Sequence, residues 1–157
     1  LESRGLGDVY KRQYDEFVDR FTGMSKKIKI GNGLDPETTM GPLAHDRRVE
    51  AIEGFVSDAV SKGAKIKTGG NRIGNEGYFF EPTVLTDVPL DARMMNEEPF
   101  GPVAPITPFN DFDSAIEESN RLEYGVGFYK RAKRQTFNTN CCSCVVLSWL
   151  QEIIYHV

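Results

Sequence analysis

The spacing of hydrophobic residues predicts two amphipathic helices. In the first, apolar side chains recur every three or four residues and so share one helical face; they are Tyr14, Phe17, Val18, Phe21, Met24 and Ile28. We expect Gly31-Asn32-Gly33 to end this helix. A second helix is predicted from about Asp46 to Lys62, with a left-handed C-terminal cap at Gly63. Its predicted buried face consists of Val49, Ile52, Val56, Ala59 and Val60.

Shorter segments after the second helix have the composition of strands. Residues 64–68 alternate apolar and basic side chains, which is typical of a half-buried strand. Residues 78–80 and 83–85 are also strand-like, and Pro82 favours an edge or a bulge between them. Residues 103–109 form a further extended run, and Pro105 and Pro108 favour an edge position for it as well.

A third helix is predicted after these strands. Asp111 or Asp113 can cap it, Ala115 and Ile116 lie on its apolar face, and Tyr124-Gly125 ends it. Helices that alternate with strands indicate an α/β layer architecture. The length of 157 residues is that of one domain with a sizeable core.

Composition and charge exclude several classes of protein. Apolar residues make up 39% and charged residues 27%, as in ordinary globular proteins, and the net charge is −4. That balance disfavours a nucleic-acid or anionic-membrane partner. No apolar run approaches the roughly 20 residues that a membrane-spanning helix needs. All the cysteines lie in residues 141–144, so no disulfide framework is indicated and we expect a cytoplasmic location.

No metal site is predicted. The spacing of Cys141, Cys142 and Cys144 does not match the paired cysteines of zinc sites, and His45 has no second ligand nearby in the sequence.

Several short motifs occur in an order that resembles the aldehyde dehydrogenase superfamily. They are Tyr14-Asp15-Glu16-Phe17-Val18, Gly31-Asn32-Gly33-Leu34-Asp35-Pro36, Met40-Gly41-Pro42-Leu43, Gly77-Tyr78-Phe79-Phe80-Glu81-Pro82-Thr83-Val84 and Asn96-Glu97-Glu98-Pro99-Phe100-Gly101-Pro102-Val103. The last is the most specific, and the resemblance runs from Tyr14 to about Gly125. Within the superfamily it is similar to the semialdehyde dehydrogenases, the succinate-semialdehyde enzymes among them.

The resemblance implies cofactor-binding roles for two residues. Glu98 would grip the ribose on the nicotinamide side of NAD or NADP, because one carboxylate can accept a hydrogen bond from each of two neighbouring hydroxyls. Phe100 would pack beside the same end of the cofactor, and Gly101-Pro102 would form the turn that aims both side chains. The alternatives are a solvated surface for Glu98 and a plain core position for Phe100. Glu97 is expected to be solvated surface.

The resemblance also implies a fold and a reaction. The fold is an incomplete catalytic domain, with helices packed on a mostly parallel sheet. The parent enzyme would oxidise an aldehyde to a carboxylate through a cysteine thioester and would form homo-oligomers. The cysteine and the general-base glutamate would precede Tyr14, so no catalytic residue is assigned and the fragment is expected to be inactive. A non-catalytic nucleotide-binding or interaction module is the alternative. The aldehyde and the choice between NAD and NADP stay open.

The two ends of the chain stand apart from this pattern. Residues 1–13 resemble a translated sequencing adapter, and we interpret them as a scar; a genuine polar arm is the alternative. The partial catalytic domain is assigned to residues 14–125. Residues 126–157 depart from the family pattern after Gly125, and we interpret them as an out-of-frame tail; a divergent but real C-terminus is the alternative.

Overall fold

The fold is built from two long helices and a small sheet. The computed structural model describes residues 4–108, 117–118, 121–122 and 144–146, and it describes the side chains of residues 14–108, 117–118 and 121–122. The elements follow the order α1 (Arg4–Ser25), α2 (Asp46–Ser61), β1 (Lys65–Thr68), β2 (Thr83–Thr86), the 3-10 helix η1 (Arg93–Met95), β3 (Val103–Pro108) and β4 (Cys144–Val146).

The sheet is mixed, so the expectation of a mostly parallel sheet was wrong. Its strand order is β1-β2-β3-β4, and only β2 and β3 run parallel, while β1 and β4 pair antiparallel with their neighbours. The connections explain the directions. A loop without a helix joins β1 to β2 and lets the chain turn back, whereas residues 87–102, which include η1, form the longer crossover that a parallel pair requires.

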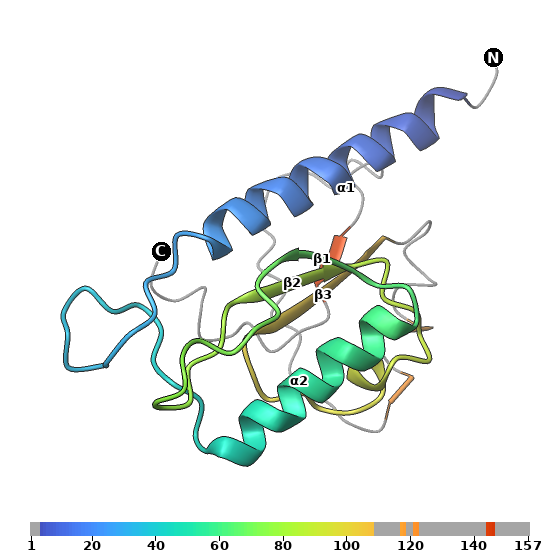
Figure 1. The fold of residues 1–157 in the computed structure, drawn as a ribbon. Helices are drawn as coiled ribbons and strands as arrows, with labels where there is room; N and C mark the ends of the chain where they lie inside the picture. The colour runs from blue at the N-terminus through green and yellow to red at the C-terminus, as the bar shows by residue number, and fades with distance from the viewer. Residues whose placement is uncertain (1–3, 109–116, 119–120, 123–143, 147–157) are drawn as a thin grey trace.

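The two helices cover opposite faces of the sheet (Figure 1). Because successive strand residues point to opposite faces, Val84 lies under α1 and Leu85 lies under α2. Tyr14 ties α1 to the sheet by donating a hydrogen bond from its hydroxyl to the Ile106 carbonyl, 3.0 Å away. The larger cluster, on the α2 face, comprises Val49, Ile52, Phe55, Val56, Ala59, Ala64, Phe80, Leu85, Val88, Ala92, Met94, Met95 and Val103.

Both predicted helices are present, with corrected bounds and faces. α1 begins at Arg4, so residues 4–13 continue the predicted helix toward the N-terminus, and it ends at Ser25 rather than at Gly31. α2 matches its prediction to within one residue, and Gly63 has the expected positive φ of 104°. Val60 is 43% exposed, so its assignment to the buried face was wrong. Phe55, which the pattern missed, is buried instead.

The strand predictions were less accurate. β1 is an exposed edge strand rather than a half-buried one, and Ile66 is 42% exposed. Residues 78–80 form no strand, although Phe80 makes an isolated bridge to Arg72. β2 and β3 are interior strands, so the edge positions inferred from their prolines were wrong. Pro82 precedes β2. Pro105 lies outside the register with β4, which covers only residues 106–108.

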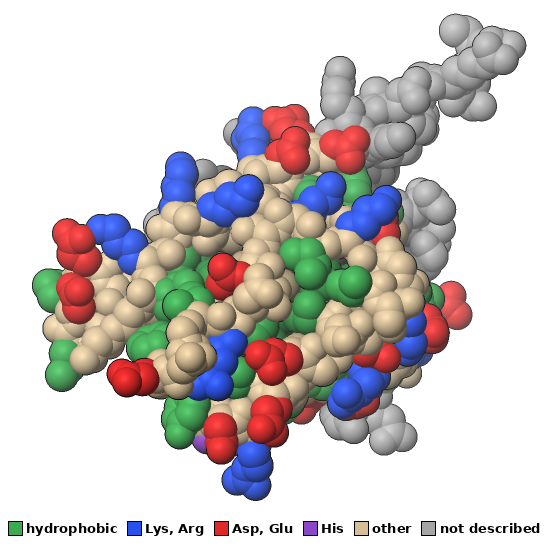
Figure 2. Space-filling view, in the orientation of Figure 1, with side chains coloured by type: hydrophobic (Ala, Val, Ile, Leu, Met, Phe, Trp, Pro, Cys, Tyr) green, Lys and Arg blue, Asp and Glu red, His purple; other side chains and the backbone are tan. Residues whose placement is uncertain are grey.

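The remaining predictions fall mostly on residues outside the described ranges. Of the third helix the structure describes only residues 117–118 and 121–122, and of the C-terminal tail only β4. Among the described helices, none combines the length and apolarity needed to cross a membrane. Acidic and basic side chains are interspersed over the face drawn in Figure 2, around patches of hydrophobic side chains.

Candidate functional site

The candidate site lies in the loop of residues 96–102, between η1 and β3. Met94 and Met95 of η1 are buried, and Val103 returns the chain to the core, so both ends of the loop are fixed by packing. At the start of the loop, the Asn96 side-chain amide donates to the Leu90 carbonyl at 2.7 Å and to the Ala92 carbonyl at 2.9 Å. The loop is therefore positioned by its neighbours in the chain before it reaches Glu98.

Glu98 presents a carboxylate without a protein partner in the described part of the chain. Its side chain is half-buried, and no hydrogen bond or ion pair to it occurs among the described residues. A carboxylate in this state has both oxygens available as hydrogen-bond acceptors. Its predicted role in gripping a ribose remains a prediction, and the geometry leaves the necessary acceptors available.

Phe100 has an exposed ring on a strained backbone. The side chain is 43% exposed, and φ is +39°, a left-handed conformation that bulky residues rarely adopt. The ring also contacts α2, since the Arg48 guanidinium carbon lies 5.3 Å from the ring centroid. Such strain is often found at ligand sites, where surrounding contacts maintain it. The predicted packing of Phe100 against a cofactor likewise remains a prediction.

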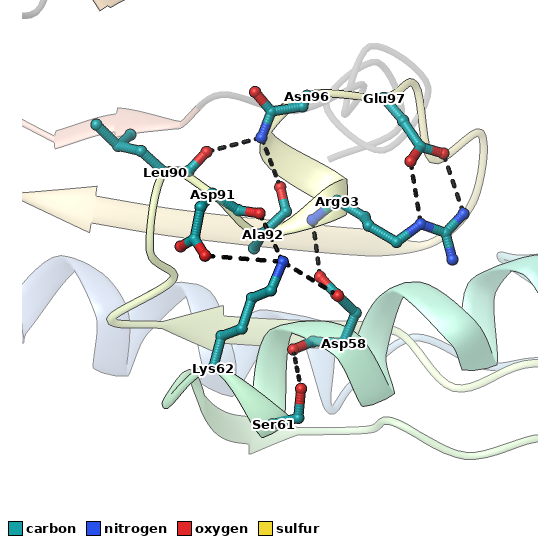
Figure 3. A network of polar contacts seen from close by, with 9 residues as sticks. All are labelled: Asp58, Ser61, Lys62, Leu90, Asp91, Ala92, Arg93, Asn96 and Glu97. Atoms are coloured by element: carbon teal, nitrogen blue, oxygen red, sulfur yellow. Dashed lines mark hydrogen bonds and ion pairs between the residues drawn. The ribbon is translucent and has the colours of Figure 1, made fainter.

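The Glu97 side chain belongs to a network of charged side chains (Figure 3). Arg93 binds both of its carboxylate oxygens, each at 3.0 Å. These hydrogen bonds, from a cation, lower the pKa of Glu97 below its ordinary value of 4.5 and raise the pKa of Arg93. The same guanidinium lies 4.7 Å from the Phe55 ring centroid. Glu97 is thus exposed at the surface, as expected, and it is paired with Arg93.

Asp58 and Lys62 of α2 belong to the same network (Figure 3). The Arg93 backbone N–H donates to the Asp58 carboxylate at 2.8 Å, and this bond is the main reason that the pKa of Asp58 lies below its ordinary value of 3.8. Lys62 donates to the Asp91 carbonyl at 2.6 Å and pairs with Asp58 at 3.2 Å. α2 is therefore connected to the start of η1, at Asp91 and at Arg93.

A further arginine that contacts the loop is Arg121, in the described pair 121–122. Arg121 donates to the Asn96 side-chain oxygen at 2.7 Å and to the Met95 carbonyl at 2.8 Å. It also binds both oxygens of Glu118 at 3.0 Å. Although Arg121 lies at the surface, it fixes Asn96 directly before the two glutamates.

Sequence reasoning missed the three arginines that contact this loop among the described residues. The four-residue spacing of Arg93 and Glu97 was a signal that could have been used, because such pairs meet within one turn. Arg48 and Arg121 gave no comparable signal. Arg48 donates to the Pro99 carbonyl, 51 positions away in the chain, at 3.5 Å, and only the tertiary fold brings them together.

His45 has a structural role. Its ring Nδ1 accepts a hydrogen bond from the Arg48 backbone N–H at 3.2 Å, which caps the N-terminus of α2. Within the described ranges, no three His, Cys, Asp or Glu residues are arranged so that they could hold a metal ion. The cysteines at 141 and 142 lie outside the described residues, and the side chain of Cys144 is not described.

Known proteins resemble the chain in both sequence and structure. It is 45% identical over 116 residues to a protein of Sinorhizobium fredii named as a probable succinate-semialdehyde dehydrogenase using NADP(+); the match covers 74% of this chain and 24% of that protein. It is also 45% identical over 126 residues to glutarate-semialdehyde dehydrogenase of Pseudomonas putida, covering 79% and 26% respectively. The chain thus spans about a quarter of these relatives.

A solved structure gives the same result. The crystal structure of succinate-semialdehyde dehydrogenase from Burkholderia pseudomallei superposes with a TM-score of 0.69 at 39% identity, over 73% of this chain and 24% of that one. The model of the aldehyde dehydrogenase family matches residues 8–129, which is more than half of the chain. The chain therefore belongs to the aldehyde dehydrogenase family.

Proposed function

We propose that this chain is part of an NAD(P)-dependent dehydrogenase that oxidises a semialdehyde to a dicarboxylate. The names of the two relatives at 45% identity support the substrate class. The observation that carries the proposal is the Glu98 carboxylate, which has no protein partner in the described part of the chain although arginines bind residues on either side of it.

Glu98 and Phe100 would bind the nicotinamide half of the cofactor. The carboxylate would accept hydrogen bonds from the two ribose hydroxyls, and the exposed Phe100 ring would supply an apolar surface beside them. When bound, NAD or NADP would supply the hydride acceptor for the oxidation. The chain's own residues would orient the ribose and thereby place the nicotinamide ring for that transfer.

We propose further that the 157 residues do not oxidise aldehydes by themselves. Residues 1–140 contain no cysteine, and Cys141, Cys142 and Cys144 lack the sequence context that the family nucleophile has. The purified chain, supplied with succinate semialdehyde and NAD or NADP, is expected to produce no reduced cofactor above the background rate. Measurable turnover that is abolished by a cysteine-blocking reagent would contradict this part of the proposal.

The role of Glu98 can be tested in a chimera. The matched segment of the Burkholderia enzyme would be replaced by that of this chain, and KM for the cofactor measured by absorbance at steady state. Glu98→Gln should raise that KM about 10- to 100-fold, because charge-assisted hydrogen bonds are lost. Glu53→Gln, which changes an exposed glutamate on α2, should leave KM unaltered. An unchanged KM in the Glu98→Gln chimera would refute the assignment.

A further inference from the structure

We propose that Arg48 is a positioning residue that fixes Glu98 and Phe100 for cofactor binding. The inference rests on the proposed function of those two residues. Arg48 is at the N-terminal end of α2, far from them in sequence, and its side chain ends at the C-terminal half of the 96–102 loop. It acts through Phe100 and Pro99, and no direct contact with the cofactor is needed.

The backbone of Arg48 is fixed by the helix cap. Its N–H donates to the His45 ring nitrogen at 3.2 Å and to the His45 carbonyl at 3.0 Å. The residue therefore starts from a defined point on the first turn of α2. A planar guanidinium on such a base can stack on an aromatic ring and donate a hydrogen bond at the same time.

The side chain of Arg48 uses both of these properties. Its guanidinium lies over the Phe100 ring, 5.3 Å from the centroid to the guanidinium carbon, and Nη1 is 3.5 Å from the Pro99 carbonyl oxygen. One helical turn further along the same face of α2, Ile52 lies directly against Gly101. α2 thus contacts three consecutive loop residues directly after Glu98.

The other half of the loop is fixed independently. Arg93 binds Glu97 and Arg121 binds Asn96, so the residues before Glu98 are already positioned. Without Arg48, the strained left-handed backbone of Phe100 would lose a contact that maintains it. We expect the loop to relax at Phe100, and Glu98 to lose its orientation as a consequence.

The test uses the full 157-residue chain and nicotinamide mononucleotide, which carries the relevant ribose with both hydroxyls. Its dissociation constant is measured by titration followed with ¹⁵N NMR. Arg48→Ala should raise that constant about two- to tenfold, the range expected for a lost cation–π contact. Arg48→Lys keeps the charge but not the planar stack, and it should restore part of the affinity. Arg47→Ala, on the exposed side of the same turn, is the matched control and should change nothing.

Amide hydrogen exchange in the chain without ligand gives a second readout. Exchange of the Thr83 and Val103 N–H groups, which donate to Pro102 and Gly101, should speed up severalfold in Arg48→Ala. The Ala64 N–H, which donates to Ala59 at the far end of α2, should keep its rate and so show that the fold as a whole is intact.

The outcomes separate this inference from the proposed function. If Glu98→Gln weakens binding but Arg48→Ala changes neither affinity nor exchange, the role of Arg48 is refuted and the proposed function stands. If Arg48→Ala speeds Ala64 exchange equally, Arg48 only stabilises the fold and the inference fails. If the parent chain does not bind the mononucleotide, the proposed role of Glu98 fails for this chain, and exchange at Thr83 and Val103 alone decides whether Arg48 positions the loop.

Discussion

Because Gly101 has no side chain, the 96–102 loop can lie directly against Ile52 of α2. An added Cβ at this position would lie 2.5 Å from the Ile52 Cδ1 atom and 2.8 Å from Cγ1, closer than real Cβ contacts. Ile52 is fully buried and cannot move easily, because its neighbours in the core are packed around it. Only glycine therefore lets the 96–102 loop approach α2 closely enough for Arg48 to reach Phe100.

We expect Gly101→Ala to destabilise the chain by about 1–3 kcal/mol, the usual cost of overpacking a filled site. The free energy of unfolding would be measured by urea denaturation. Gly23→Ala is the control: nothing lies within 4 Å of its added Cβ, and it should stabilise α1 by about 0.5 kcal/mol. Equal stability of Gly101→Ala and the parent chain would mean that Ile52 can shift at little cost.

At the scale of elements, α2 and η1 are joined by hydrogen bonds and ion pairs in addition to apolar packing. Asp58 of α2 accepts a hydrogen bond from the first residue of η1, while Arg93 reaches forward to Glu97 (Figure 3). Both carboxyl pKa values are lowered, so the folded state releases these protons more readily than the unfolded chain does. Such groups stabilise the fold above their unfolded pKa values, and this contribution is lost as the pH falls through the folded ones.

Because the pKa values of Asp58 and Glu97 are lowered in the fold, the free energy of unfolding should decrease at acidic pH. As the pH drops below the ordinary values of 4.5 for Glu97 and 3.8 for Asp58, the urea midpoint of the parent should fall. The double variant Asp58→Asn, Glu97→Gln should start lower at neutral pH and lose less on acidification. Glu53→Gln should follow the parent curve. A double variant whose midpoint falls as steeply as that of the parent would show that the network does not contribute.

At the scale of the whole molecule, β2 is the structural centre. Figure 1 shows the sheet between the two helices. The four residues of β2 are buried, with Val84 in the cluster on the α1 face and Leu85 in the cluster on the α2 face, so the strand belongs to both core clusters. Among the described residues the two helices pack into separate core clusters on either side of this sheet, and α2 also contacts η1 and the 96–102 loop directly. Loss of packing at β2 should affect both faces together.

Leu85→Ala should cost about 2–5 kcal/mol, because it removes a fully buried side chain and leaves a cavity. Leu34→Ala makes the same chemical change at a side chain that is 91% exposed, and it should alter stability by less than about 0.5 kcal/mol. Thermal unfolding followed by circular dichroism would compare the two. Similar melting temperatures for both variants would contradict the central position of Leu85.

Local spacing in the sequence determined the helices and located the loop that carries the candidate site. The three-to-four periodicity of α2 and the glycine after it follow from residues within a turn of one another, so the sequence alone predicts them. The motif of residues 96–103 located the loop, and its resemblance to the aldehyde dehydrogenase family predicts cofactor-binding roles for Glu98 and Phe100.

Tertiary structure decided the strand directions and the surroundings of Glu98. Whether β2 is an edge or an interior strand depends on β1 and β3, which no local pattern specifies, and Pro82 gave a misleading signal. The contacts of Arg48 with Phe100 and of Arg121 with Asn96 join residues far apart in the chain. An arginine can pair with many groups, and only the packing of α2 against the loop selects these partners.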